Sequence, residues 1–362
     1  MRLHSRGRAP RALSAFALSR VVAPLALSLA LALAGCRSAP APPPTVPIPF
    51  SEAVRTRPDL TIVVTDSGLG GLSVAADLAA RLPASGISRS ARIVFVNALL
   101  DDAIGYNDLL LEKDKLRVFD AALSAMESRY RPDLILVACN TLSVLYARTE
   151  HAKGGGAPVV EIVGMGADLV ARTLGQKPGG TAVLFATRTT IESGAHRRLL
   201  VQEGIPEDRI VGEACHRLAG AIERGPESDE TKGYVRTFVA EAIGKLPASP
   251  GPLVVSLNCT HYGYAGPLWK ETFASLGYPG VTVVDPNPLM ADLVLREGAP
   301  RRWPETAVTV EVVSKAEITA EIRDSLGSLL RQTSPATADA LAGYRLVPDL
   351  FSVAIDPSAI RH

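Results

Sequence analysis

The stretch LILVACNTLSVLY, residues 134–146, contains the most informative local signal of the chain. A short, wholly apolar run ends there in a cysteine followed by two small polar residues. Runs that are apolar at every position are typical of parallel strands covered by helices on both faces. Many buried cysteines are inert small hydrophobes, but a strand-to-helix junction also lowers the pKa of a thiol. From these residues alone, Cys139 is a packing residue, a structural thiol or a catalytic base.

The rest of the chain repeats the same alternation of apolar runs and amphipathic segments. Strands are expected at 60–65, 91–97, 133–139, 158–164, 181–187, 252–259 and 281–285. Helices are expected at 73–82, 111–130, 191–204 and 230–246. Regular strand–helix alternation predicts a doubly wound α/β fold with parallel sheets.

Polar residues follow four of these strands, where ligands bind in doubly wound sheets. The segments are DSGLGGLS (66–73), CNTLS (139–143), TRTTIES (187–193) and CTHY (259–262). Asp66 and Cys139 are 73 positions apart, and Thr187 and Cys259 are 72 apart. This spacing predicts two similar halves that face each other, with the active site between them and one thiol from each half.

Two facing thiols suit a symmetric reaction, in which one group removes the α-proton of an amino acid and the other returns a proton on the opposite face. Racemisation is such a reaction. No lysine that could form a Schiff base with pyridoxal phosphate follows these strands, so no cofactor is expected. Asp66 and His261 are placed to assist the thiols. Polar side chains for the carboxylates and amino group of a substrate are Ser67, Asn140, Thr141, Thr190 and Thr260.

Five motifs in order extend this interpretation. They are VVTDSGLGGLSV (63–74), VACNT (137–141), ATRTTIESGAH (186–196), EACHRLAGAIERG (213–225) and NCTHY (258–262). Together they resemble the aspartate/glutamate racemase family, most closely its glutamate-specific members, over about residues 60–330. The resemblance implies a cofactor-independent isomerase, without a metal, that interconverts L- and D-glutamate and serves peptidoglycan synthesis. It also makes a homodimer the expected assembly.

The resemblance assigns roles residue by residue. It makes Cys139 and Cys259 the acid/base thiols, assisted by Asp66, Glu223 and His261. The implied substrate contacts are Ser67, Tyr106, Asn107, Asn140, Thr141, Thr187, Thr190 and Thr260. One domain is expected over 60–160 together with 283–333, and the second over 161–282. Residues 334–362 form a C-terminal extension beyond the resemblance.

Three positions depart from the family pattern. IGYND (104–108) stands in place of a Pro-Tyr-Gly loop, which leaves the choice between glutamate, aspartate and another amino acid open. His196 replaces a tyrosine and is expected to lie on a helix surface. Cys215 has no catalytic counterpart and is expected to be structural.

The N-terminal residues have a different composition. Five arginines and no acidic residue precede VVAPLALSLALALAG (21–35), which is short for a ~30 Å hydrocarbon core. The run ends in LAGC, so residues 1–36 resemble a bacterial lipoprotein signal with lipidation at Cys36. Residues 37–59 are expected to be a Pro-rich linker. The expected location is the cell envelope, anchored in the membrane by lipid and facing the periplasm. Arg37 favours the outer membrane, and a mis-assigned start would instead leave the protein cytoplasmic.

Composition limits the partners. The net charge of +1 and the lack of a basic stripe argue against nucleic acid. Three hypotheses remain: an exported glutamate racemase, a racemase of the same fold for aspartate or another amino acid, and a non-catalytic envelope binding protein. If Cys36 is lipidated, three cysteines remain, which is a poor disulfide framework. The substrate gap is expected to keep Cys139 and Cys259 too far apart for a disulfide.

Overall fold

The structure is a computed structural model that describes residues 52, 55–102, 104–297 and 300–361. The chain divides into the units Met1–Pro43 and Pro44–His362, and all described residues belong to the second. The predicted signal sequence, Cys36 and the first part of the linker lie outside the described residues. Within the described part of the chain, no helix has the length and apolar character needed to cross a membrane.

Six parallel strands form the first sheet, in the order β10-β9-β2-β1-β3-β4. Their bounds are β1 (Asp59–Asp66), β2 (Ser90–Asn97), β3 (Leu134–Val137), β4 (Val159–Glu161), β9 (Ala307–Ser314) and β10 (Arg345–Leu346). Asp66 pairs with Asn97, and Thr65 pairs with Val137. The carboxyl ends of the three central strands therefore lie along one edge, where the polar motifs begin.

Four parallel strands form the second sheet, in the order β6-β5-β7-β8. They are β5 (Thr181–Ala186), β6 (Ile210–Ala214), β7 (Leu253–Asn258) and β8 (Thr282–Val284). This order repeats the order β2-β1-β3-β4 of the first sheet. The predicted α/β fold with parallel sheets is confirmed. We call each sheet with its covering helices a lobe.

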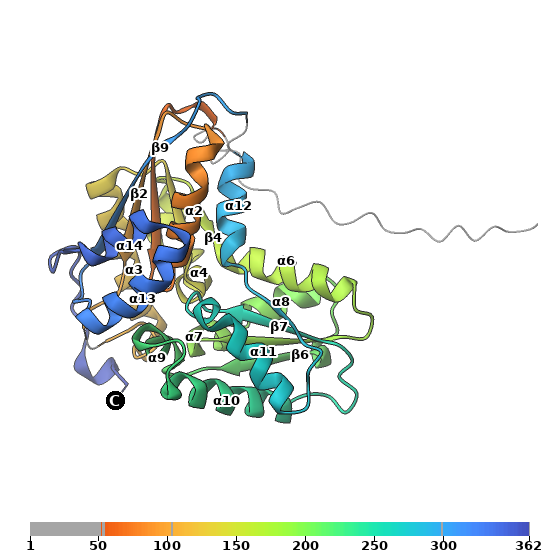
Figure 1. Cartoon of the computed structure of the whole chain (residues 1–362). Coiled ribbons are helices and arrows are strands. Elements are labelled where there is room, and N and C mark those ends of the chain that lie inside the picture. The colour runs from red at the N-terminus through yellow and green to blue at the C-terminus, as the bar shows by residue number, and fades with distance from the viewer. Residues whose placement is uncertain (1–51, 53–54, 103, 298–299, 362) are drawn as a thin grey trace, which may run out of the picture. The chain divides into compact units, whose positions relative to one another are not determined.

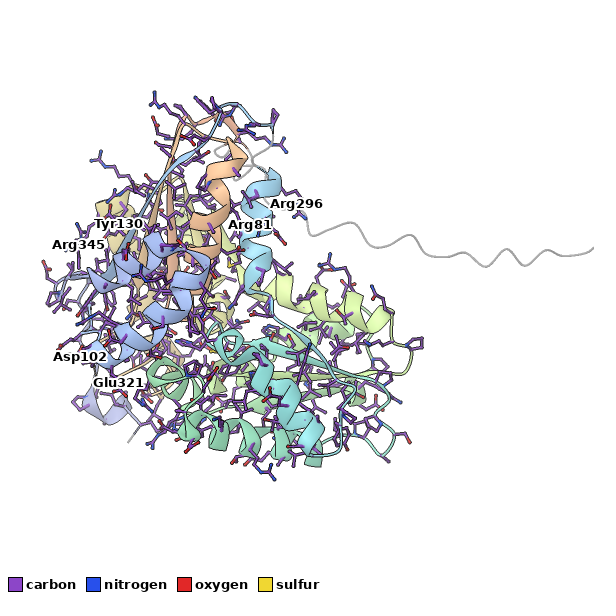
Figure 2. The ribbon with its side chains drawn as sticks, viewed as in Figure 1. Arg81, Asp102, Tyr130, Arg296, Glu321 and Arg345 are labelled. Atoms are coloured by element: carbon purple, nitrogen blue, oxygen red, sulfur yellow. The ribbon has the colours of Figure 1, made fainter. Side chains whose placement is uncertain are left out.

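Helices cover both faces of the first sheet. They are α2 (Leu72–Ser85), α3 (Glu112–Tyr130), α4 (Asn140–Tyr146), α5 (Glu150–Gly154), α12 (Asn287–Glu297), α13 (Ala320–Thr333) and α14 (Pro335–Ala342). One apolar core joins the sheet to α2, α12, α13 and α14, and a second joins its other face to α3 and α4. Arg81 of α2, labelled in Figure 2, donates to Asp292 of α12 at 2.6 Å and so links two helices of the first face.

The second sheet is covered in the same way. Its helices are α6 (Ile162–Gly175), α7 (Arg188–Ser193), α8 (Ala195–Gln202), α9 (Leu218–Arg224), α10 (Asp229–Gly244) and α11 (Gly266–Ser275). Figure 1 shows α10 and α11 on one side of this sheet and α6 and α8 on the other. Apolar side chains on both faces of a strand are what a doubly covered parallel sheet requires.

Three expectations from the sequence were wrong in detail. The run 158–164 is a strand only to Glu161, whose side chain accepts from the Val163 N–H at 2.8 Å and caps α6. The expected helix 191–204 is split at Gly194, where φ is 65° and the backbone is left-handed. His196 is buried, not on a surface, and burial lowers its pKa to about 4.

Candidate active site

Both thiols lie where a strand meets the following turn. Cys139 is two residues beyond β3 and precedes α4 in an extended conformation, and Cys259 directly follows β7. Both are buried, with 5% and 6% of their surface exposed. They line a single cavity of about 290 Å³ that both lobes contribute to. The packing that buries each strand therefore delivers one thiol from each lobe to the same space.

Twelve of the thirteen residues predicted for catalysis or substrate binding line this cavity. They are Asp66, Ser67, Tyr106, Asn107, Cys139, Asn140, Thr141, Thr187, Glu223, Cys259, Thr260 and His261. Thr190 is the exception, because it lies behind the wall. Its hydroxyl is 3.0 Å from that of Thr187, which is in turn 2.7 Å from the hydroxyl of Thr141. These three hydroxyls form a chain that joins α7 to α4.

Cys139 has a mostly apolar environment. Its Sγ is 3.1 Å from the Ser67 hydroxyl, and it shares a core cluster with Tyr106 and Leu142. Burial raises the pKa of the Cys139 thiol well above its ordinary value, and the charge of Asp66 raises it further. The hydrogen bond from Ser67 opposes this shift without reversing it. The raised pKa therefore keeps Cys139 in its thiol form at neutral pH.

Cys259 has a charged environment. Its Sγ is 3.6 Å from His261 Nδ1, and His261 Nε2 is 2.6 Å from Glu223 Oε1. Burial lowers the pKa of His261, but the hydrogen bonds with Cys259 and Glu223 outweigh burial and raise it well above its ordinary value. The imidazole is therefore cationic at neutral pH. Glu223 is itself oriented by the Leu69 N–H, which donates to the same oxygen at 2.9 Å.

Asp66 ties the two lobes together beside the thiols. Its Oδ2 accepts from the Gly71 N–H at 2.7 Å and from the Thr260 hydroxyl at 2.6 Å. The turn must be glycine-rich, because a Cβ on Gly70 would lie 2.3 Å from Thr260 Oγ1. The close approach of this turn to the second lobe explains the DSGLGG sequence.

Several polar atoms beside Cys139 have no partner within the part of the chain that the structure describes. They are Oδ1 and Nδ2 of Asn140 and the hydroxyl of Tyr106, and both side chains are at least 98% buried. Buried polar groups are nearly always hydrogen-bonded in folded proteins, because an unpaired one costs about 1–3 kcal/mol. Their position in the cavity wall makes them candidate contacts for a bound molecule.

A group of charged residues in the same cavity wall was not predicted from the sequence. Arg188, His216, Arg217 and Asp108 all line it. Neither guanidinium has a hydrogen bond or ion pair with any residue that the structure describes. Asp108 accepts from the Gly105 N–H at 2.8 Å. Burial lowers the pKa of His216, and the positive charges of Arg188 and Arg217 lower it further.

Two features of the sequence bear on these missed residues. Arg188 directly follows Thr187, within the polar segment TRTTIES (187–193) that follows a predicted strand. Arg217 follows β6, a strand that was not expected, and has a left-handed backbone with φ of 63°, which is uncommon for a residue other than glycine. Cys215, expected to be structural, also lines the cavity as a buried free thiol.

The described residues that line the cavity include no lysine, so they do not fit a Schiff-base cofactor. Across residues 52, 55–102, 104–297 and 300–361, no three His, Cys, Asp or Glu side chains are grouped as metal ligands would be. What the wall does supply is two thiols, an imidazolium paired with a carboxylate, and unpaired hydrogen-bonding groups. This is an arrangement for moving protons on a small polar molecule.

Comparison with known proteins agrees with this chemistry. The profile of the Asp/Glu/Hydantoin racemase family matches residues 62–294. Glutamate racemase from Chlorobaculum tepidum is 26% identical over 261 residues, which cover 71% of this chain and 88% of that protein. Glutamate racemase from Corynebacterium glutamicum is 27% identical over 288 residues, covering 76% and 94%.

Solved structures show the same fold. A glutamate racemase isoform from Bacillus anthracis superposes with a TM-score of 0.58 at 18% identity, covering 81% of this chain and 96% of that one. Glutamate racemase from Francisella tularensis in complex with D-glutamate gives 0.57 at 21% identity, covering 77% and 95%. At these identities, the likeness supports the fold alone.

Fold and site together define an α/β enzyme with paired thiols in one cavity between two parallel sheets. The chain belongs to the Asp/Glu/Hydantoin racemase family, whose profile covers the second sheet and strands β1 to β4 of the first. It is a glutamate racemase-like isomerase, and the resemblance predicted from its motifs is confirmed.

Proposed function

We propose that the protein interconverts the enantiomers of glutamate by proton transfer between Cys139 and Cys259, without a cofactor. The observation that carries the proposal is the pair of buried thiols, one from each lobe, in the wall of one cavity. The expected domains, 60–160 with 283–333 and 161–282, would each supply one of them.

The proposed reaction conserves protons. One cysteine, as thiolate, takes the α-proton and becomes a thiol, and the resulting carbanion takes a proton from the other cysteine, which becomes a thiolate. The product has the opposite configuration, and the roles of the two cysteines are exchanged. His261, held cationic by Glu223, would stabilise the thiolate of Cys259. Asn140 and Tyr106 would donate to the substrate and gain their missing partners.

An acidic amino acid suits the cavity. Arg188 and Arg217 lack ion-pair partners among the described residues, and guanidinium groups bind carboxylates in a planar, two-point geometry. The relatives named glutamate racemase favour glutamate as the substrate. Aspartate, or another amino acid, is the alternative because the loop IGYND (104–108) departs from the family pattern.

The cellular setting belongs to the same proposal. The lipoprotein-like residues 1–36, with Cys36 as the lipidated residue, support a protein anchored in the cell envelope and facing the periplasm. There it would supply or edit D-amino acids for peptidoglycan, and a homodimer is the assembly proposed from the family resemblance. A cytoplasmic protein with a mis-assigned start is the alternative.

The test uses protein purified under reducing conditions and incubated with L-glutamate, or separately with L-aspartate, in D2O without cofactor. Loss of optical rotation and incorporation of α-deuterium are followed, with Cys139→Ala and Cys259→Ala in parallel. Racemisation of one substrate that both variants lose supports the proposal and names the substrate. Binding of either amino acid without exchange or racemisation would contradict it and favour the envelope binding protein.

A further inference from the structure

The C-terminal residues lie beyond residues 62–294, the part matched by the family profile, yet they return to a loop that lines the cavity. We call residues 347–361 the C-terminal strap. It begins where β10 ends, with the Val347 N–H donating to the Ser314 carbonyl at 2.8 Å. The strap then crosses the face of the first sheet that α3 covers.

The middle of the strap is part of the core beside Cys139. Leu350 and Phe351 are 3% and 5% exposed and belong to the apolar cluster that contains Tyr106 and Cys139. Lys315 lies over the Phe351 ring, 5.2 Å from its centre. Burial of these two side chains fixes the course of the strap toward the cavity.

The end of the strap pairs with the chain just beyond Tyr106. The Leu110 N–H donates to the Ala359 carbonyl at 2.8 Å, and the Arg361 N–H donates to the Asp108 carbonyl at 2.7 Å. Between them, Leu109 and Ile360 form an antiparallel bridge. The pattern is that of two short strands, with both hydrogen bonds made by backbone groups.

The paired residues adjoin a loop that lines the cavity throughout. Gly105, Tyr106, Asn107 and Asp108 are all in the cavity wall. On the side of the second lobe, Asn107 Oδ1 accepts from the Thr189 N–H of α7 at 3.1 Å. The strap therefore holds this loop from one side, and α7 holds it from the other.

Residues 105–108 need such support because they belong to a long connection between β2 and α3 and because Tyr106 is one of them. The connection from β2 to α3 contains fourteen residues, and those of them that the structure describes form no helix or strand. Connections of this length are uncommon unless they are functional, and an untied one opens easily. Tyr106 is 1% exposed and its hydroxyl has no partner within the described chain, so only the fixed loop keeps it beside Cys139.

We propose that the C-terminal strap holds residues 105–108 in the cavity wall, which makes Ala359 and Arg361 positioning residues for the contacts of Tyr106 and Asn107 with substrate. The claim that Tyr106 and Asn107 contact substrate rests on the proposed function. The claim that the strap keeps the loop closed over Cys139 rests on the structure of the strap alone. Separate measurements test the two claims.

The first variant is Arg361→Pro, which removes the N–H that donates to Asp108. Ile360 has φ −105° and ψ 135°, the extended conformation that a residue before proline adopts without strain. Arg361→Ala keeps the N–H and is the matched control, since the Arg361 side chain has no bond with any described residue. A second variant lacks residues 357–362, which removes both hydrogen bonds and keeps Leu350 and Phe351.

The first measurement is the rate at which iodoacetamide alkylates each cysteine, followed by mass spectrometry of the peptides. We expect Cys139 to react about fivefold faster in Arg361→Pro, because this change removes one backbone hydrogen bond that holds the loop closed. The shortened chain loses two such bonds, so its Cys139 should react roughly 25-fold faster. Cys259, which belongs to the core of the other lobe, is the internal reference and should change less than Cys139. Cys139 keeps its rate in Arg361→Ala. An unchanged Cys139 rate in both altered chains would overturn the strap proposal.

The second measurement is the kinetics of glutamate racemisation. We expect KM to rise about fivefold in Arg361→Pro while kcat changes less, because the loop binds substrate and does not move the proton. If Cys139 is alkylated faster in the variants but the protein without substitutions does not racemise glutamate, the strap proposal is supported and the proposed function is overturned. If the protein racemises glutamate but neither KM nor the alkylation rate changes in the variants, the proposed function is supported and the strap proposal is overturned.

Discussion

Cys139 and Cys259 have matching places in the two sheets and different surroundings. Each follows the strand that flanks the first strand of its lobe, β3 beside β1 and β7 beside β5. Cys139 contacts a serine hydroxyl and an apolar cluster, while Cys259 contacts the His261–Glu223 pair. Similar strand order thus fixes where a thiol lies, and the neighbours from other segments fix its chemistry.

The difference has a consequence for the resting state. A cationic imidazole lies beside Cys259, because hydrogen bonds with Cys259 and Glu223 raise the pKa of His261, whereas burial and the charge of Asp66 raise the pKa of Cys139 and keep it protonated. In a two-thiol racemase, each direction of the reaction begins with a different cysteine as the thiolate. One direction must therefore begin with Cys139 deprotonated, which is the less favourable protonation state. The asymmetry therefore predicts that the two directions depend differently on the residues around each thiol.

The largest effect is expected from removing one thiol. Cys139→Ala and Cys259→Ala should each lower racemisation by at least about 100-fold, as loss of a general acid or base does. Each variant should still exchange the α-hydrogen of the one enantiomer that faces the remaining thiol. Exchange should be faster in Cys139→Ala, because the remaining Cys259 has the imidazolium beside it. Deuterium incorporation into L- and D-glutamate measures this, and equal exchange of both enantiomers would contradict the comparison.

Next in size is the loss expected from Glu223→Gln. The carboxylate raises the pKa of His261, so its removal lowers that pKa. The imidazolium form of His261 is the form required for activity, so activity falls as the pH rises through the pKa of His261. Because Glu223→Gln lowers that pKa, the alkaline limb of the pH–activity profile should move to lower pH. We expect activity to fall about 10- to 100-fold at pH 8 and by less at pH 6. Glu230→Gln is the control, since Glu230 pairs with Arg224 on an exposed surface. An unshifted pH profile would argue against the role of Glu223.

A smaller effect should come from the unpaired guanidinium groups. Arg188→Gln and Arg217→Gln should each raise KM for glutamate about tenfold, because a hydrogen bond between charged groups is worth about 1.5–3 kcal/mol. Arg224→Gln changes an arginine on α9 that is paired with Glu230 and should leave KM unchanged. Substrate titrations at fixed pH measure the effect. A fall in kcat alone would show that these side chains do not bind the substrate carboxylate.

The smallest effect is expected from Ser67→Ala. Burial and Asp66 raise the pKa of Cys139, and the hydrogen bond from Ser67 opposes them, so removing the hydroxyl should raise that pKa further. The pH midpoint for alkylation of Cys139 should move upward, with about a fivefold slower reaction at a given pH below it. Cys259 in the same sample provides the reference. A downward shift of the Cys139 midpoint would contradict the assigned direction.

Much of the fold could be predicted because buried parallel strands have a strong local signature. The run at 60–65 lies within β1, and the run at 181–187 covers β5. β6 and β9 were missed, since IVGEA contains glycine and glutamate and AVTVEVVS alternates more than a fully buried strand does. Without β6, the sequence offered no reason to place Arg217 near the thiols.

Residue types alone indicate that two cysteines end apolar strands and that polar turns follow them, because burial on both faces of a strand selects those types within a few positions. What each thiol faces depends instead on the packing of distant segments. Leu69 and Glu223 are 154 residues apart along the chain, and Asp66 and Thr260 are 194 apart. Hydrogen bonds over such separations depend on how the two sheets pack, and no local pattern records that packing.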